Sequence, residues 1–333
     1  MRWHTALLAV CALTATSMLA ACGDDAPSTL TLVVYDSFPT EGTALNDALA
    51  EFTSDSGIAV KIAVAGDAGT MVTKATLTAG NPEGDVMWGA DNTLLSAATS
   101  AEVFDGDLVQ VDYGDVCVNH DIAWFAEQSL EPPRTLDDLL LPQYANLLVV
   151  EDPTTSSPGL AFLLATIAHA GDDGWQDYWT RLRDNSVEVV DSWSTAYYER
   201  FSGSAGSQGD RPLVVSYGSS PPAEVVFADP PRDDAPTGVA AGTCFRQIEY
   251  AGVLRGSAHV AEARELVRFL TSERFQRELP LTLFVYPAND AVALPEVFTK
   301  YAVIPTDPFT MEPDRIDQYR RQWQDEWSDI VTG

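Results

Sequence analysis

The stretch LLVVEDPTTSSPGLAFLLATIA, residues 147–168, contains a complete strand-turn-helix unit. Its first four residues, 147–150, are all apolar, which is typical of a strand buried on both faces. A polar run at 154–159 follows, with Pro158 where a helix is expected to begin, and residues 160–168 continue as an apolar helix. This order indicates an α/β fold in which helices connect parallel strands.

Similar units lie on both sides of this stretch. Segments with strand character occur at 30–35, 58–64, 85–88, 187–190 and 213–216. Apolar residues at helical spacing follow the first of them, and 71–79 reads as a further helix. Because 333 residues are long for one hydrophobic core, we expect two α/β lobes of ordinary domain size.

The N-terminus has the features of an export signal. One arginine precedes an apolar run at 6–15 that is too short to span a bilayer, so residues 1–21 are predicted to be a signal peptide. Leu19-Ala20-Ala21-Cys22 resembles the lipobox of bacterial lipoproteins, which predicts that Cys22 is lipidated and that residues 22–29 form a tether. We therefore expect an exported chain that is anchored to the outer face of the cell membrane.

Two segments, 111–119 and 243–250, lie between and after the two α/β series, and they predict two crossings between the lobes. We assign 30–112 and 249–333 to lobe 1, and 113–248, including the hinge crossings, to lobe 2. Cys117 and Cys244 fall on these crossings. Because paired thiols are favoured outside the cytoplasm, we predict a disulfide between them, with two separate buried thiols as the alternative.

Three further segments have simpler interpretations. Residues 260–270 and 316–327 show the apolar spacing of amphipathic helices, which we expect to pack on lobe 1. The helical spacing of Trp323 and Trp327 favours a place in the core. Residues 202–210, rich in Gly and Ser, are expected to form a mobile surface loop.

The formal net charge of −30 excludes a nucleic-acid partner, because such a chain repels polyphosphate. The acidity has two interpretations. It serves solubility on a cell surface, or its negative field favours capture of a cationic solute.

Three turns that follow strands carry hydroxyl groups and free N–H groups. They lie at 66–70, 154–159 and 217–222, each before an expected helix, where helix starts bind hydroxyl or phosphate groups. The alternative is ordinary helix capping. Tyr35, Trp193, Tyr217 and Phe284 lie near strand ends, and their rings suit heteroaromatic cations.

No zinc-ligand spacing, paired-Cys motif or nucleophile elbow occurs, so we expect no enzyme activity, no metal and no cofactor.

An ordered set of short motifs resembles the thiamine-binding proteins of bacterial ABC uptake transporters. The set comprises Tyr35-Asp36-Ser37-Phe38, Asp85-Val86 with Gly89, Asp91-Asn92 and Leu94-Leu95, Asp112-Tyr113-Gly114, Asp152-Pro153 with Thr155-Ser156 and Pro158-Gly159-Leu160, Trp193-Ser194 with Ala196-Tyr197, Ser216-Tyr217 with Ser220-Pro221, and Tyr286-Pro287. The resemblance implies the two-lobed, periplasmic-binding-protein-like fold of type II with two hinge crossings.

The resemblance also implies a set of ligand contacts. These are Asp67, Ala68, Ser156, Ser157, Trp193, Tyr217, Gly218, Ser219, Ser220 and Pro221, with Tyr35 and Phe284 completing the aromatic walls. The chain departs from the family at two of its positions, since some members have Trp where Phe284 stands and Tyr where Ala223 stands. These changes leave the stacking surface less complete.

Thiamine or a thiamine phosphate is therefore the expected ligand. We assign the four aromatic residues to the rings, Ser156, Ser157, Ser219 and Ser220 to the hydroxyethyl arm or its phosphate, and Asp67 to a polar contact near the cation. A monomer is expected to close around the ligand and deliver it to the permease subunits of the transporter.

Two other functions stay open at this point. Tyr197-Tyr198 resembles the adjacent tyrosines of iron(III)-binding proteins of similar architecture, although the sequence shows no obvious His or Glu partner. A surface-anchored serine hydrolase would use Ser219 or Ser220 as its nucleophile, but the sequence offers no histidine near them.

Overall fold

A computed structural model describes residues 28–333 of the chain. The predicted signal peptide and Cys22 lie outside the described residues, as does most of the predicted tether. Within residues 28–333, no helix combines the length and the apolar character that a membrane span requires.

The described residues form a curled, mixed sheet of nine strands, in the order β2-β1-β3-β8-β4-β7-β5-β6 with β9 paired to β4. The strands are β1 (Thr29–Val34), β2 (Ala59–Val64), β3 (Val86–Asp91), β4 (Val109–Asp121), β5 (Leu148–Glu151), β6 (Glu188–Val190), β7 (Leu213–Tyr217), β8 (Thr237–Val253) and β9 (Tyr286–Pro287). Each end of the sheet is parallel, as the sequence predicted, since β1 pairs with β2 and β3, and β5 pairs with β6 and β7.

The helices cover both ends of this sheet. They are α1 (Ala44–Ser56), α2 (Ala68–Leu77), α3 (Leu95–Ser100), α4 (Ile122–Gln128), α5 (Ser157–Ala170), α6 (Trp175–Asp184), α7 (Pro221–Val226), α8 (Val260–Leu270), α9 (Glu273–Gln276), α10 (Leu279–Thr282), α11 (Glu296–Tyr301) and α12 (Pro313–Thr332). Local signals explain several boundaries. Thr43 and Asn46 form a capping box at the start of α1, and Gly57 ends that helix at a φ of 74°.

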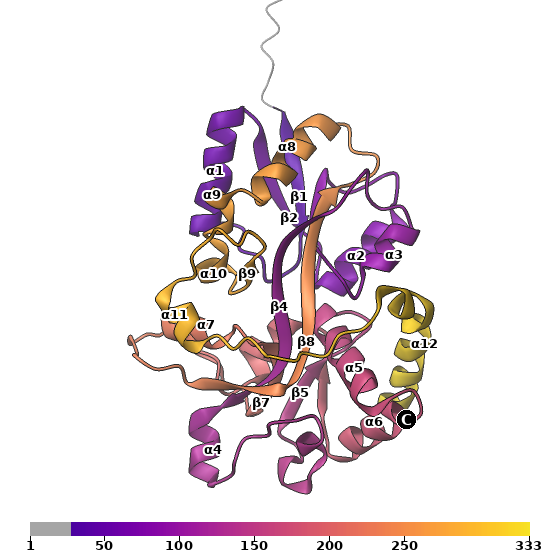
Figure 1. Ribbon diagram of the computed structural model, residues 1–333, viewed down its shortest axis with the longest axis vertical. Helices are drawn as coiled ribbons and strands as arrows, with labels where there is room; N and C mark the ends of the chain where they lie inside the picture. Colours follow the sequence, from indigo (N-terminus) through magenta and orange to yellow (C-terminus); the bar gives the residue numbers. More distant parts are fainter. Residues whose placement is uncertain (1–27) are drawn as a thin grey trace, which may run out of the picture.

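The long strands β4 and β8 run side by side through both lobes (Figure 1). They pair in an antiparallel manner along most of their length, with register shifts near Asp112 and Val118. The predicted disulfide between Cys117 and Cys244 joins them, with the two Cα atoms 4.1 Å apart. The proposed lobe boundaries at 112/113 and 248/249 fall inside these continuous strands. The two lobes therefore share one sheet, and the division of the chain at these residues remains a proposal.

Two main apolar clusters pack against the sheet, and the larger one extends from one end of the sheet to the other. Leu30, Leu32, Phe52 and Trp88 belong to a cluster under α1 and α8. A larger cluster surrounds α5, whose residues from Ser157 to Ile167 are all buried. Burial on all sides explains why this helix is apolar around its whole circumference, which is the feature that made residues 147–168 conspicuous in the sequence.

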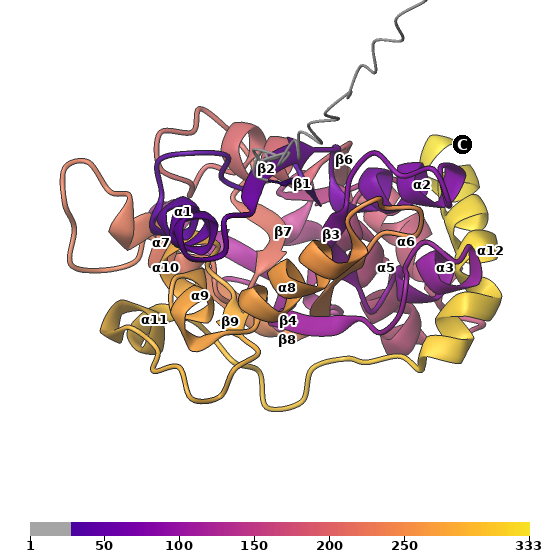
Figure 2. The ribbon, with the colours of Figure 1, turned by 90° about the horizontal axis from the view of Figure 1, so that it is seen from above.

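The C-terminal helix α12 does not pack as predicted. The expectation that it lies on lobe 1 is wrong, because it packs mainly on α6 in the second lobe and also touches α3 (Figure 2). Trp327 meets Trp179 of α6 edge to face, with ring centroids 5.5 Å apart. Trp323 and Trp327 are buried, which confirms their predicted place in the core. An amphipathic pattern predicts that a helix buries one face, but it does not identify the surface that covers it.

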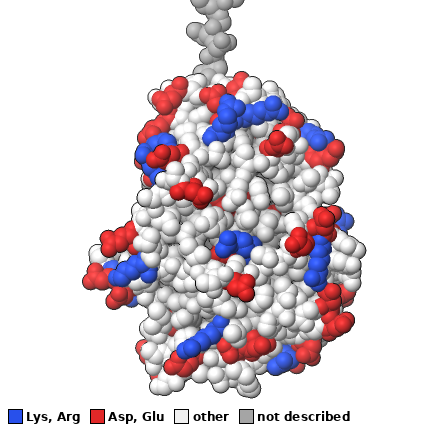
Figure 3. Space-filling view, in the orientation of Figure 1, with Lys and Arg blue, Asp and Glu red and all other residues white. Residues whose placement is uncertain are grey.

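Charged side chains are distributed over the surface shown in Figure 3. Acidic and basic groups are interspersed near the edge of that face, and much of its centre is uncharged. The net charge of the chain is therefore not gathered into one patch on this face, which agrees with the interpretation of acidity as an aid to solubility.

Candidate functional site

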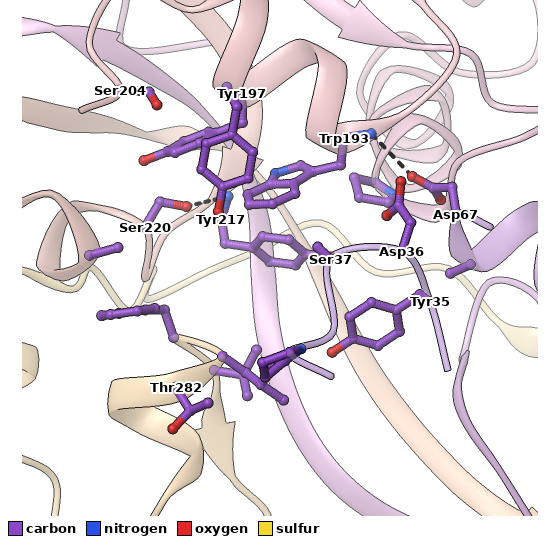
Figure 4. A pocket seen from close by; sticks show the side chains of 18 of the residues that line it. Tyr35, Asp36, Ser37, Asp67, Trp193, Tyr197, Ser204, Tyr217, Ser220 and Thr282 are labelled. Atoms are coloured by element: carbon purple, nitrogen blue, oxygen red, sulfur yellow. Dashed lines mark hydrogen bonds between the residues drawn. The ribbon is translucent and has the colours of Figure 1, made fainter. Parts of the chain in front are cut away.

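A cavity of about 390 Å³ lies between the two ends of the sheet, where several strands terminate. Figure 4 shows it from close by. Its wall consists of Tyr35, Asp36, Ser37, Pro39, Thr43, Asp67, Ala68, Ser157, Pro158, Trp193, Tyr197, Tyr198, Ser204, Ala205, Tyr217, Ser220, Ala223, Glu224, Phe227, Glu249, Thr282, Leu283, Phe284 and Val285. These residues come from both lobes and from β8, so movement at the hinge would change the shape of the cavity.

Aromatic side chains form much of the wall, and polar contacts hold them in place. Trp193 and Tyr197 stack with their centroids 5.0 Å apart and their planes inclined by 15°. The indole Nε1 of Trp193 donates to Ser216 Oγ at 3.0 Å, and the Tyr197 hydroxyl donates to Glu224 Oε1 at 2.8 Å. The rings are thus oriented before any ligand arrives, which lowers the entropy lost on binding.

Two glycines make room for the tyrosine rings. A Cβ on Gly89 would lie 2.5 Å from Cδ1 of Tyr35, and a Cβ on Gly114 would lie 3.1 Å from Cδ1 of Tyr217. Gly89 also has a φ of +113°, a conformation that side chains rarely allow. Glycine at these two positions therefore lets each ring lie against a neighbouring strand.

Asp67 connects the two lobes at one end of the cavity. Its Oδ1 accepts a hydrogen bond from the backbone N–H of Ser157 at 3.3 Å, and its Oδ2 accepts one from the N–H of Trp193 at 3.1 Å. Next to it, the N–H of Thr70 donates to the carbonyl oxygen of Thr155 at 3.0 Å. Burial raises the pKa of Asp67 to about 6, although the bond from Trp193 opposes that change.

The close approach at this point depends on Gly69. A Cβ on Gly69 would lie 2.4 Å from the carbonyl oxygen of Thr155. We expect Gly69→Val to separate the lobes, because backbone atoms cannot yield to a side chain at that distance. Small-angle X-ray scattering should then give a larger radius of gyration than for the wild type.

Thr73→Val is the matched control, because it places the same side chain on an exposed position of α2. Its radius of gyration should equal that of the wild type. An unchanged radius for Gly69→Val would show that this contact does not hold the lobes together.

The charged groups of the wall are all acidic. Asp36, Asp67, Glu224 and Glu249 line the cavity, and none of the lining residues is Lys, Arg or His. Burial raises the pKa of Glu249 well above its ordinary value, and the neighbouring Asp112 raises it further. Burial also raises the pKa of Asp112 to about 7, despite the hydrogen bond from Trp88. Such a site favours the binding of a cation, because a positive charge reduces the repulsion among these carboxylates.

A sequence profile described as bacterial extracellular solute-binding protein matches residues 32–279, most of the chain. The chain belongs to this family. Solute-binding proteins of this kind bind and release a ligand without converting it, so the chain is not an enzyme and its ligand is not a cofactor. As a member of an extracellular family, it is exported.

Named relatives and solved structures are similar to this solute-binding protein over most of its length. The thiamine-binding periplasmic protein of Salmonella typhimurium (strain LT2) is 28% identical over 319 residues, covering 91% of this chain and 93% of the relative. The protein of the same name from Brucella suis biovar 1 is 27% identical, covering 91% and 92%.

A solved periplasmic thiamin binding protein superposes with a TM-score of 0.78 at 26% identity, over 91% of this chain and 96% of that one. Bordetella ferric binding protein, at 17% identity and a TM-score of 0.60 over 91% and 99% of the two chains, shares the fold alone. The predicted two-lobed fold of type II is therefore confirmed.

The structure brings eight of the twelve predicted ligand contacts to the cavity wall. They are Tyr35, Asp67, Ala68, Ser157, Trp193, Tyr217, Ser220 and Phe284. The other four, Ser156, Gly218, Ser219 and Pro221, do not line it. Ser156 is the N-cap residue of α5, and its side chain is buried, as is that of Ser219. A residue that is adjacent in sequence to a lining residue does not thereby reach the cavity, because successive side chains point in different directions.

Several lining residues were not predicted as ligand contacts. Glu249 comes from the second hinge crossing, which the sequence suggested only as a connection. Ser204 and Ala205 come from the segment 202–210, which was expected to be a mobile surface loop, yet Ser204 is buried and the N–H of Ala205 donates to Glu224. The Gly- and Ser-rich composition of this segment therefore predicted irregular structure correctly, but it did not predict that Ser204 is buried.

The tyrosine pair considered for iron(III) has other contacts in this solute-binding protein. The sequence suggested no acidic partner, but Glu224 accepts the hydrogen bond of Tyr197, so that expectation is wrong. The ring of Tyr198 is nearly perpendicular to that of Tyr197, at 88°. Among residues 28–333, no group of three or more His, Cys, Asp or Glu side chains could hold a metal ion.

The serines considered for hydrolysis also lack catalytic contacts. Ser220 Oγ lies 2.9 Å from Ser216 Oγ and accepts from the N–H of Tyr217 at 3.2 Å. Ser219 is fully buried. Neither hydroxyl has a histidine as its hydrogen-bond partner among the described residues, so a general base for nucleophilic attack is missing there.

Proposed function

We propose that this solute-binding protein captures thiamine, free or phosphorylated, in the cavity between its lobes and delivers it to the permease of an ABC importer. The observation that carries the proposal is a wall that combines stacked aromatic rings with four carboxylates and no basic side chain. Thiamine contains a permanently cationic thiazolium ring and a flat aminopyrimidine. Aromatic faces and carboxylates are the groups that bind such rings. The names of the relatives support the same ligand.

Seven of the twelve predicted contacts have a role in this proposal. Tyr35, Trp193, Tyr217 and Phe284 contact the rings, and Asp67 lies near the cation. Ser157 and Ser220 are the predicted serines that line the cavity, so we assign the hydroxyethyl arm to them. Because Asp67 joins both lobes, a ligand beside it would favour the closed form that a permease recognises.

Titration calorimetry tests the proposal on protein that has been unfolded and refolded to remove any bound ligand. Thiamine is expected to release heat and to change tryptophan fluorescence. 4-Amino-5-hydroxymethyl-2-methylpyrimidine, which lacks the thiazolium ring, should bind at least about tenfold more weakly, since a desolvated cation–aromatic contact contributes up to about 2 kcal/mol. The absence of any response to thiamine or its phosphate esters would refute the proposal.

Thiamine affinity is expected to fall as the pH is lowered from 8 to 5. The pKa of Asp67, which lines the cavity, is raised to about 6, so this carboxylate is ionised at pH 8 and becomes largely neutral by pH 5. The thiazolium charge does not titrate, and it therefore loses this partner as the pH falls. Calorimetry across the range should show a decrease of about tenfold for each unit by which the ligand lowers the pKa of Asp67. A pH-independent affinity would contradict a role for this carboxylate.

We also propose that Cys22 carries a lipid anchor. In a bacterium that processes lipoproteins, Cys22→Ser should move the protein from the detergent phase to the aqueous phase of a Triton X-114 partition, because two acyl chains are lost. Ser17→Ala, which leaves the cysteine in place, is the control and should remain with detergent. Recovery of the Cys22→Ser protein in the detergent phase would exclude lipidation at this position.

A further inference from the structure

We propose that Phe227 is a further ligand-binding residue of this protein, and that its ring forms with Phe284 a cover at the mouth of the cavity that slows release of the ligand. The inference rests on the proposed function and deepens it, because Phe227 is not among the predicted contacts. Its basis is an exposed aromatic ring that lines the cavity and meets a ring of the opposite lobe.

Helix α7 directs Phe227 toward the cavity. The N–H of Phe227 donates to the carbonyl oxygen of Ala223 at 2.9 Å, so the two residues lie one turn apart on the same face of the helix. Both line the cavity. Because Ala223 carries only a methyl group, it covers little of the wall, and the ring on this face of α7 is that of Phe227.

The surroundings of Phe227 are unusual for a phenylalanine. Its exposed fraction is 61%, the largest of any aromatic side chain among residues 28–333. Phenylalanine is normally buried, because contact between apolar surface and water is unfavourable. A residue that is exposed and also lines the cavity lies at its mouth. A flat ligand beside this ring would remove part of its surface from water, and that gain exists only in the complex.

The partner ring, Phe284, belongs to lobe 1 and has a strained backbone. The ring centroids of Phe227 and Phe284 are 5.4 Å apart and their planes are inclined by 69°, which is a favourable edge-to-face contact. Phe284 follows α10 at a φ of 55°, in the left-handed region that glycine usually occupies after a helix. Strain of this kind is concentrated at ligand-binding sites, which agrees with a role for the paired rings.

The segment after Phe227 is also fastened to lobe 1. The hydroxyl of Tyr301, in α11, donates to the carbonyl oxygen of Asp233, and Lys300 Nζ lies 3.8 Å from Asp234 Oδ1. Helices α7 and α11 are in contact (Figure 1). These contacts hold the segment across the boundary between the lobes. Because exposed ion pairs contribute little stability, the segment can open when a ligand enters or leaves.

The test measures how fast labelled thiamine leaves ligand-stripped and reloaded protein when excess unlabelled thiamine is added. Phe227→Ala should raise the dissociation rate constant at least about tenfold, which corresponds to about 1.4 kcal/mol. The association rate constant, followed by stopped-flow tryptophan fluorescence, should change by less than about threefold, because a contact that forms after entry acts mainly on release.

Val226→Ala is the matched control. It shortens the neighbouring side chain of α7, which is also exposed but does not line the cavity, so both rate constants should equal those of the wild type. Hydrogen exchange gives a second measurement, which needs no variant. Thiamine should slow amide exchange in residues 227–234 of the wild type, because the bound ligand holds this segment closed.

Three results would overturn the inference. They are a dissociation rate constant in Phe227→Ala equal to that of the wild type, an equal increase in Val226→Ala, and amide exchange in 227–234 that thiamine does not alter. A wild-type protein that retains no labelled thiamine would instead refute the proposed function.

Discussion

Trp193→Ala is expected to weaken thiamine binding by about 2 kcal/mol, or about 30-fold. The indole is held between the ring of Tyr197 and the cavity, and its Nε1 is fixed by Ser216, so it meets a ligand in a single orientation. Alanine removes the stacking surface and the contact of a π face with the thiazolium cation. It also leaves the Tyr197 ring without its neighbour. Calorimetry and a competition assay both measure the change.

Two further variants distinguish the loss of ring stacking from a general disturbance of the structure. Trp193→Phe keeps an aromatic face but loses the bond to Ser216, so its loss of affinity should be smaller than that of alanine. Trp124→Ala removes a tryptophan that packs on Phe125 in α4 and does not line the cavity, and thiamine affinity should stay at the wild-type value. An unchanged affinity in Trp193→Ala would remove this residue from the site.

The double variant Cys117→Ala, Cys244→Ala is expected to lower the free energy of unfolding by about 4 kcal/mol. The two cysteines are 127 residues apart in sequence, and a cross-link that closes so long a loop strongly restricts the unfolded chain. Both residues are buried between the hinge strands, and their replacement by alanine also removes packed sulfur atoms. Urea denaturation, followed by tryptophan fluorescence, measures the difference.

Reduced wild-type protein provides the comparison for this experiment. With dithiothreitol present, its denaturation midpoint should approach that of the double variant, and the reductant should not change the midpoint of the variant itself. A difference of less than about 1 kcal/mol between oxidised wild type and double variant would show that the bond contributes little to stability.

Much of the fold could be predicted because its signals are local. Buried parallel strands need continuous apolar segments, so the runs at 30–35, 147–150 and 213–216 correspond closely to β1, β5 and β7. The pairing of Cys117 with Cys244 followed from their places on the two crossings and from the expected export of the chain. The aromatic residues near strand ends were found in the same way, because ligands of open α/β sheets bind at those ends.

The sequence by itself determined the α/β class, the crossings and most of the aromatic wall, since each depends on residue type and short-range spacing. Tertiary structure alone decided which groups meet. It placed α12 on α6, brought Glu249 and Ser204 to the cavity, and buried the side chains of Ser156 and Ser219. It also joined Asp67 to the start of α5, across a sequence separation of 90 residues. Long-range pairs of this kind depend on how the lobes pack, and no local pattern in the chain encodes that arrangement.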